Sequence, residues 1–80
     1  MEKYNRKKPN KKFQSNKQIY LQNQNIDDCA KFCSEELGFD CLSFDFCYIT
    51  GDCRLSDSSL SETEDYITAN DCDIYESIYK

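Results

Sequence analysis

The stretch CAKFCSEELGFDCLSFDFCYITGDC, residues 29–53, contains five of the six cysteines of this 80-residue chain. An even number of cysteines at this density is typical of a small domain held together by disulfides, because so short a chain cannot bury a large apolar core. A zinc site is the alternative reading, but the chain has no histidine and no Cys-x-x-Cys pair. We therefore expect disulfides, with no bound metal and no cofactor.

The first part of this stretch belongs to a helical pattern. Asn25 is the expected N-cap, acidic residues follow it in the first turn, and Gly38 is expected to end the helix in the left-handed conformation. Apolar residues recur between them with the spacing of one helix face: Ile26, Cys29, Ala30, Cys33 and Leu37. Two cysteines on that face predict a helix attached twice to the layer beneath it.

The second part of the stretch alternates like a strand. Residues 41–48 place Leu42, Phe44, Phe46 and Tyr48 on one face, which we expect to be core, and a Gly-Asp turn returns the chain through residues 53–56. Residues 57–65 are expected to form a polar loop and residues 65–79 one or two further strands. One or two short strands are expected around residues 19–21. KKPNKK, residues 7–12, has the only proline and no apolar residue, and is expected to be a turn or an arm.

The charge of the chain is divided unevenly. Residues 1–17 carry seven basic residues and one acidic residue, a net charge of +6, whereas residues 18–80 carry three basic and fourteen acidic residues, a net charge of −11. A basic arm on an acidic body indicates an anionic partner. A sulfated glycan such as heparin suits it better than a specific nucleic acid, which the acidic body would repel; a plain linker is the alternative. The expected glycan-binding residues are Arg6, Lys7, Lys8, Lys11 and Lys12.

Catalysis is not expected. There is no histidine to act as a general base, paired cysteines are not nucleophiles, and the acidic residues are expected on the solvent side of the helix, strand and loop. The polar loop at 57–65 lacks the turn glycine and the final glutamate of a calcium loop. Tyr66, Tyr75 and Tyr79 are too many to be buried together in so small a domain, so we expect them to include protein contacts.

These motifs resemble the PAN/apple domain family, which includes the N-terminal modules of plasminogen and hepatocyte growth factor. The resemblance is carried by CAKFC, GFDCLSFDF and GDCRLS, by the early aromatics Tyr4 and Phe13, and by the closing DIYES. It implies an α+β fold with one α-helix packed on an antiparallel sheet of about five strands. It also implies the disulfides Cys29–Cys53 and Cys33–Cys41, and accepting these leaves Cys47–Cys72, a pair that would put Asp73 on the helix side of its strand.

The expected organisation is a basic N-terminal arm at residues 1–12, including a candidate first strand, and a single domain at residues 13–80. No apolar segment follows Met1 as in a signal peptide, and no run of about twenty apolar residues would insert into a membrane. We read Met1 as an added start on one module of a multidomain chain. The expected function is non-catalytic recognition of a protein or an acidic glycan, by a secreted protein or the ectodomain of a membrane protein. A free-standing small secreted effector or inhibitor is the alternative.

Overall fold

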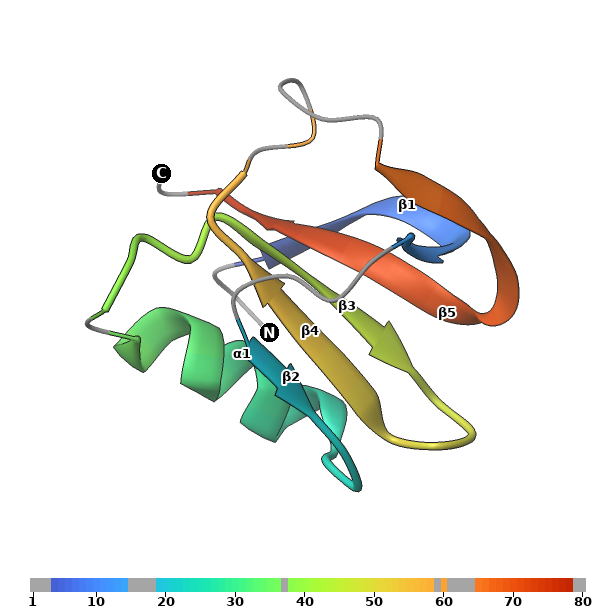
Figure 1. The fold of residues 1–80 in the computed structure, drawn as a ribbon, viewed down its shortest axis with the longest axis horizontal. Helices are drawn as coiled ribbons and strands as arrows, with labels where there is room; N and C mark the ends of the chain where they lie inside the picture. The colour runs from blue at the N-terminus through green and yellow to red at the C-terminus, as the bar shows by residue number, and fades with distance from the viewer. Residues whose placement is uncertain (1–3, 15–18, 37, 59, 61–64, 79–80) are drawn as a thin grey trace.

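The computed structural model describes residues 4–14, 19–36, 38–58, 60 and 65–78. Five strands form one antiparallel sheet in the order β1-β5-β3-β4-β2, and helix α1 packs against one face of β3 and β4 (Figure 1). The predicted α+β architecture, with one helix on a sheet of about five strands, is confirmed. The elements are β1 (Tyr4–Phe13), β2 (Ile19–Leu21), α1 (Ile26–Glu35), β3 (Ser43–Cys47), β4 (Asp52–Ser56) and β5 (Tyr66–Ser77).

Helix α1 begins as predicted and ends earlier than predicted. The Asn25 side chain accepts a hydrogen bond from the Asp28 backbone N–H at 2.8 Å, which caps the first turn. The helix ends at Glu35. Gly38 does not have a positive φ, so the predicted left-handed stop at Gly38 is wrong; the glycine with a positive φ is Gly51, in the turn between β3 and β4. The physical reason is the Cys33–Cys41 disulfide, which brings the chain back to the helix within eight residues. Leu37, predicted on the apolar face, lies outside the described residues.

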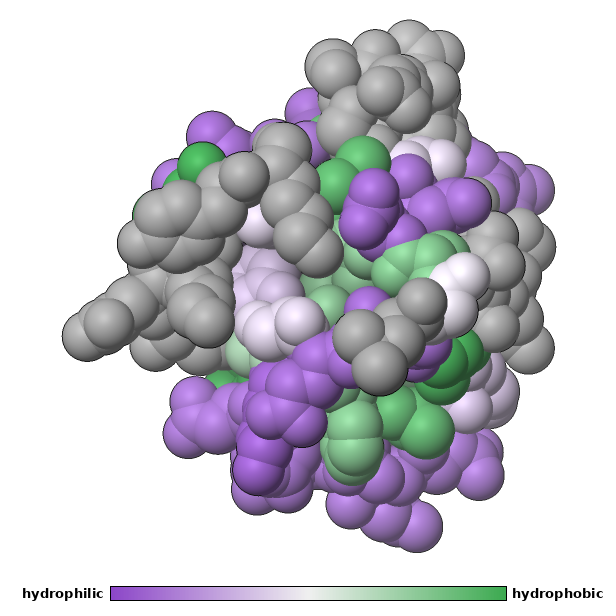
Figure 2. Space-filling view, turned by 90° about the vertical axis from the view of Figure 1, so that its left-hand side faces the viewer, coloured by the Kyte–Doolittle hydropathy of each residue, from purple (hydrophilic) through white to green (hydrophobic). Residues whose placement is uncertain are grey.

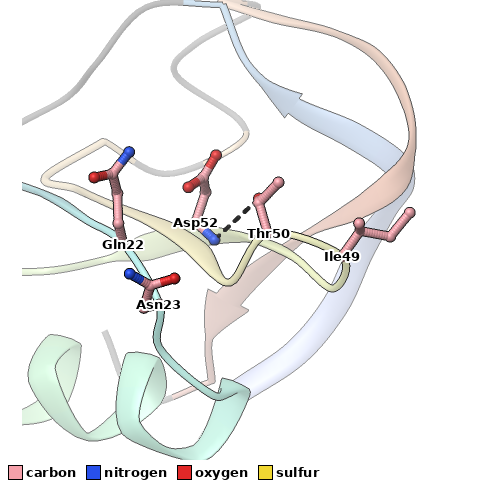
Figure 3. Close-up of a pocket in the computed structure, with 5 residues that line it drawn as sticks. All are labelled: Gln22, Asn23, Ile49, Thr50 and Asp52. Carbon is pink, nitrogen blue, oxygen red and sulfur yellow. Dashed lines mark hydrogen bonds between the residues drawn. The ribbon is translucent and has the colours of Figure 1, made fainter.

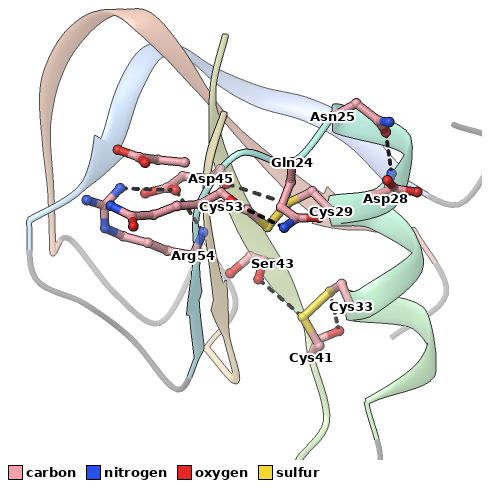
Figure 4. The surroundings of a disulfide bond; sticks show 12 residues. Gln24, Asn25, Asp28, Cys29, Cys33, Cys41, Ser43, Asp45, Cys53 and Arg54 are labelled. Atoms are coloured by element: carbon pink, nitrogen blue, oxygen red, sulfur yellow. Dashed lines mark hydrogen bonds and ion pairs between the residues drawn. A yellow bond between two sulfur atoms is a disulfide. The ribbon is translucent and has the colours of Figure 1, made fainter. Parts of the chain in front are cut away.

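Two disulfides fasten α1 to the layer beneath it. Cys29–Cys53 joins the helix to β4, and Cys33–Cys41 joins it to the segment that leads into β3 (Figure 4). All four of these cysteines are 0% exposed. The third disulfide, Cys47–Cys72, joins residues that lie directly opposite each other on β3 and β5, with their Cα atoms 4.0 Å apart. The structure thus forms the same three pairs that the resemblance implied.

The core between helix and sheet is built around Phe44, as its place in the alternating pattern predicts. The rings of Tyr4 and Tyr75 lie 5.1 and 5.2 Å from the Phe44 ring, edge-on and stacked respectively. Phe46 is buried as predicted. Tyr48 is not a core residue: β3 ends at Cys47, so Tyr48 lies in the turn and is 48% exposed. The prediction is therefore wrong for Tyr48.

Residues 7–12, expected to be a turn or an arm, are part of strand β1. The strand pairs with β5 from Tyr4 opposite Ser77 to Phe13 opposite Tyr66. Tyr4 and Phe13, at the two ends of β1, are buried. Its pairing is irregular around residues 7 and 10, and Pro9 is compatible with it because β1 is an edge strand. The sequence gave no strand signal here because the residues between Tyr4 and Phe13 are largely exposed, so polar and apolar residues do not alternate along the segment.

A buried carboxylate ties three strands together on the sheet face opposite the helix. Asp45 of β3 is 0% exposed, so the expectation that the acidic residues face solvent is wrong for it. Its oxygens accept hydrogen bonds from the backbone N–H groups of Phe13 at 2.9 Å and Arg54 at 3.1 Å, and the Arg54 guanidinium lies 3.5 Å away (Figure 4). Burial raises the Asp45 pKa to about 6, although the bonds from Phe13 and Arg54 oppose that rise.

The disulfide from α1 to β4 is predicted to contribute more to stability than its loop length alone explains. The Cys29–Cys53 and Cys47–Cys72 bonds close loops of almost equal length, with separations of 24 and 25 residues, so chain entropy alone assigns about 3.5 kcal/mol to each. Replacing Cys29 and Cys53 by serine also places two hydroxyls in a fully buried core. We expect that double variant to lose most of the fold in urea titrations followed by near-ultraviolet circular dichroism.

The matched control for this prediction is the Cys47→Ser, Cys72→Ser variant. It should be destabilised less because Cys47 and Cys72, although 4% and 2% exposed, lie outside the apolar cluster between helix and sheet that contains Cys29 and Cys53. Equal losses in the two double variants would show that the bonds act through loop entropy alone. A fully reduced wild-type protein that kept its near-ultraviolet dichroism and melting temperature would contradict the account altogether.

The Asp45 carboxyl is predicted to titrate with a midpoint near pH 6 in the folded protein and near its ordinary value of 3.8 in urea. Because its pKa is higher in the folded state, the folded protein binds the proton more tightly. Its contribution to stability is therefore present at low pH and is lost as the pH rises from about 4 through 6. Carbon-detected NMR of the side-chain carboxyl, with and without urea, measures both midpoints. A folded-state midpoint below 4 would contradict the prediction.

Candidate functional site

The expected glycan-binding residues all lie on the described part of β1, and three of them have partners within the domain. Arg6, with 59% of its side chain exposed, lies 3.7 Å from the Asp73 carboxylate. The Lys8 ammonium is 5.4 Å above the centre of the Tyr66 ring, and the Lys11 ammonium donates a hydrogen bond to the Thr68 hydroxyl at 2.9 Å. These contacts fix the direction of each side chain without removing its charge.

The basic side chains are spread over the length of a bent strand. Arg6 and Lys8 lie opposite Tyr75 and Ile74, and Lys7 lies between them where the register shifts. Lys11 and Lys12 pair with the outer part of β5, opposite Thr68 and Ile67. Strand β1 is bent over this range, because Asn10 has a φ of 58° and the pairing with β5 shifts between Pro9 and Lys11. Five positive charges at separate positions on the strand match a polyanion better than a single phosphate or carboxylate.

A polar cluster holds the middle of β1 in place and accounts for an acidic residue on the helix side of β5. Asp73, 7% exposed, accepts hydrogen bonds from the Asn10 backbone N–H and the Tyr48 hydroxyl, each at 2.9 Å. The Tyr48 hydroxyl is also 2.6 Å from the Tyr75 hydroxyl. Desolvation of the Tyr48 hydroxyl, which lies against Asp73 and Tyr75 although the residue as a whole is 48% exposed, and then the hydrogen bonds to Tyr75 and Asp73 raise the pKa of Tyr48 above its usual value. These groups are all satisfied by one another, so we assign the cluster a structural role.

Of the tyrosines expected to contact a protein, the structure describes Tyr66 and Tyr75. Tyr75 is 8% exposed and stacks on Phe44, so the prediction is wrong for this residue: a core ring is not available to a partner. Tyr66 is half-buried beneath Lys8, and Tyr79 lies outside the described residues. On the face shown in Figure 2, both apolar and hydrophilic side chains reach the surface.

The structure also contains features for which the sequence gave no signal. Ile49, at the tip of the β3–β4 turn, is 82% exposed. It borders a shallow polar pocket that the turn forms with the loop between β2 and α1 (Figure 3). That pocket depends on a contact between segments about 27 residues apart, which local patterns do not reveal.

The described residues contain neither a free cysteine nor a cluster of potential metal ligands. All six cysteines are in disulfides, and no group of three or more potential ligands among His, Cys, Asp and Glu is close enough to hold a metal in the part of the chain that the structure describes. Over the same residues, no helix has the length and apolar character needed to cross a membrane.

Comparison with known proteins agrees with this description. The PAN domain family matches the chain over residues 4–79, from the first residue of β1 to just beyond β5, whereas neither a curated protein nor a solved structure matches it. PAN domains are generally non-catalytic modules of extracellular proteins that interact with proteins or carbohydrates, and three disulfides agree with that oxidising location. Because the match spans nearly the whole chain, we conclude that the protein belongs to the PAN domain family.

Proposed function

We propose that this domain is a recognition module of a longer secreted or membrane-anchored protein, and that it binds a sulfated glycan along β1. The observation that carries the proposal is the set of five basic side chains between Arg6 and Lys12, on one edge strand of a domain whose remaining residues are strongly acidic. A polyanion is attracted to this strand and repelled by the rest of the surface, so charge alone directs the ligand to β1.

The scaffold limits the entropy that binding costs. Tyr4 and Phe13 anchor the two ends of β1 in buried positions, and the Phe13 backbone is bonded to the buried Asp45. The backbone that carries the lysines is therefore ordered before the glycan arrives, and only side chains have to be fixed. Lysine recognises sulfate as a point charge without a shaped pocket, which predicts weak binding that depends steeply on salt.

The intramolecular contacts of the array are compatible with binding. The Arg6–Asp73 pair is 3.7 Å apart and its arginine is largely exposed, so exchange of this partner for a sulfate has a small cost. The Lys8 ammonium over Tyr66 and the Lys11 ammonium on Thr68 each keep donors available for an anion. An acidic segment of a protein partner would bind the same basic side chains. Such a partner would be recognised by its competition with heparin for β1.

The prediction is retention on a heparin column at low salt, with elution as the salt concentration rises. The variant with Lys7, Lys8, Lys11 and Lys12 replaced by glutamine should pass through unretained, because it loses four positive charges while keeping the side-chain stems. Lys31→Gln, on the exposed face of α1, is the matched control and should elute with the wild type. Near-ultraviolet dichroism of each variant checks the fold. Wild-type protein in the flow-through, or undiminished retention of the folded quadruple variant, would contradict the proposal.

A further inference from the structure

The buried Asp45 carboxyl connects the basic strand β1 to the interior of the sheet. It is 0% exposed and accepts the backbone N–H of Phe13, the last residue of β1, at 2.9 Å. Lys11 and Lys12 directly precede Phe13. Since consecutive Cα atoms are about 3.8 Å apart, the Cα atoms of both lysines lie within about 10 Å of the carboxyl. Salt screens a buried charge only weakly, so a change in the charge of Asp45 alters the potential at this end of β1.

Asp45 is also expected to change its charge close to neutral pH. The chain has no histidine, which is the side chain that ordinarily titrates between pH 5 and 8. Burial raises the pKa of Asp45 from 3.8 to about 6, although the hydrogen bonds from Phe13 and Arg54 and the positive charge of Arg54 oppose that rise. Asp45 thus provides the titration near pH 6 that a histidine provides in other pH-sensitive proteins.

The groups around Asp45 set the sign of a pH effect. On β4, the Arg54 guanidinium lies 3.5 Å from the carboxyl (Figure 4), and its central carbon lies 4.7 Å from the centre of the Tyr20 ring of β2. On β5, the apolar Ile74 lies opposite Asp45. Other charged side chains that the described strands and their ends place on this face or beside it are Lys8, Lys11, Lys12, Asp52, Asp65 and Glu76. A protonated Asp45 no longer offsets the charges of Arg54 and the lysines, so the potential along β1 becomes more positive.

We propose that Asp45 makes the binding of a polyanion to β1 depend on pH, with tighter binding at pH 5 than at pH 7. This inference rests on the proposed heparin binding and adds the regulation of that site. Linkage is reciprocal, so a bound polyanion should in turn hold the proton on Asp45 more tightly. A protonated carboxyl keeps acceptor capacity for the Phe13 N–H, so β1 remains anchored in both states.

The test measures the dissociation constant of a heparin oligosaccharide by isothermal titration calorimetry at pH 5 and at pH 7, at one ionic strength. Wild-type protein should bind about two- to tenfold more tightly at pH 5, as expected for one unit charge at about 10 Å in a medium between water and the protein surface. Asp45→Asn, which carries no charge at either pH, should lose this difference. Asp57→Asn removes an exposed carboxylate just after β4 and is the matched control; it should keep the difference.

A second measurement does not depend on a variant. Carbon-detected NMR of the Asp45 carboxyl in the wild-type protein should show its titration midpoint moving upward when the oligosaccharide is added, by the logarithm of the same factor. Near-ultraviolet dichroism checks the fold of each variant, and if Asp45→Asn does not fold, this NMR midpoint decides.

Three results would each overturn the inference: equal wild-type affinities at the two pH values, a midpoint that the oligosaccharide leaves unchanged, or a folded Asp45→Asn variant that keeps the pH dependence. Absence of heparin binding at both pH values would overturn the proposed function together with its regulation. Binding of equal strength at both pH values would overturn the regulation alone.

Discussion

The disulfide between Cys29 and Cys53 fixes the helix to the sheet, and the positions of most other parts follow from it. Both cysteines are fully buried, one on the inner face of α1 and the other in β4. A domain of 80 residues has a small apolar core whose contribution hardly exceeds the entropy lost on ordering the chain. Constraining the unfolded chain through this bond and the shorter Cys33–Cys41 loop raises the free energy of unfolding without requiring a larger core.

The disulfide-bonded helix and sheet leave β1 and the β3–β4 turn accessible at the surface. β1 is an edge strand whose ends are buried and whose middle carries basic side chains, so it is both ordered and accessible. The β3–β4 turn lies between two disulfide cysteines and packs against the β2–α1 loop through Gly51. These two places differ in charge, because β1 carries five basic side chains whereas the pocket beside the turn is lined by Asp52 and uncharged residues.

The sequence was sufficient where a residue's neighbours along the chain determine its environment. The inward stripe of α1, its Asn25 cap, and the buried alternation of Phe44 and Phe46 are local patterns, and the structure contains them. The family resemblance added the helix-to-sheet arrangement and implied the cysteine pairs, which spacing alone would have left among fifteen alternatives.

The features that were missed depend on distant partners. β1 reads as a polar segment with a proline, and only pairing with β5 about sixty residues later makes it a strand. Asp45 is an acidic residue between two buried phenylalanines of β3, and its burial depends on N–H groups supplied by Phe13 and Arg54. The pocket likewise arises from two loops that meet in space.

The covalent framework is the central claim, and digestion of the non-reduced protein tests it directly. Trypsin cleaves after Lys31 and Arg54, and a protease that cleaves before aspartate separates the remaining cysteines, so that all six fall on different peptides. At a pH low enough to prevent exchange, mass spectrometry should find residues 28–31 joined to 52–54, 32–39 joined to 40–44, and 45–51 joined to 71–72. Residues 45–51 joined instead to 40–44 or to 52–54 would contradict the structure described above.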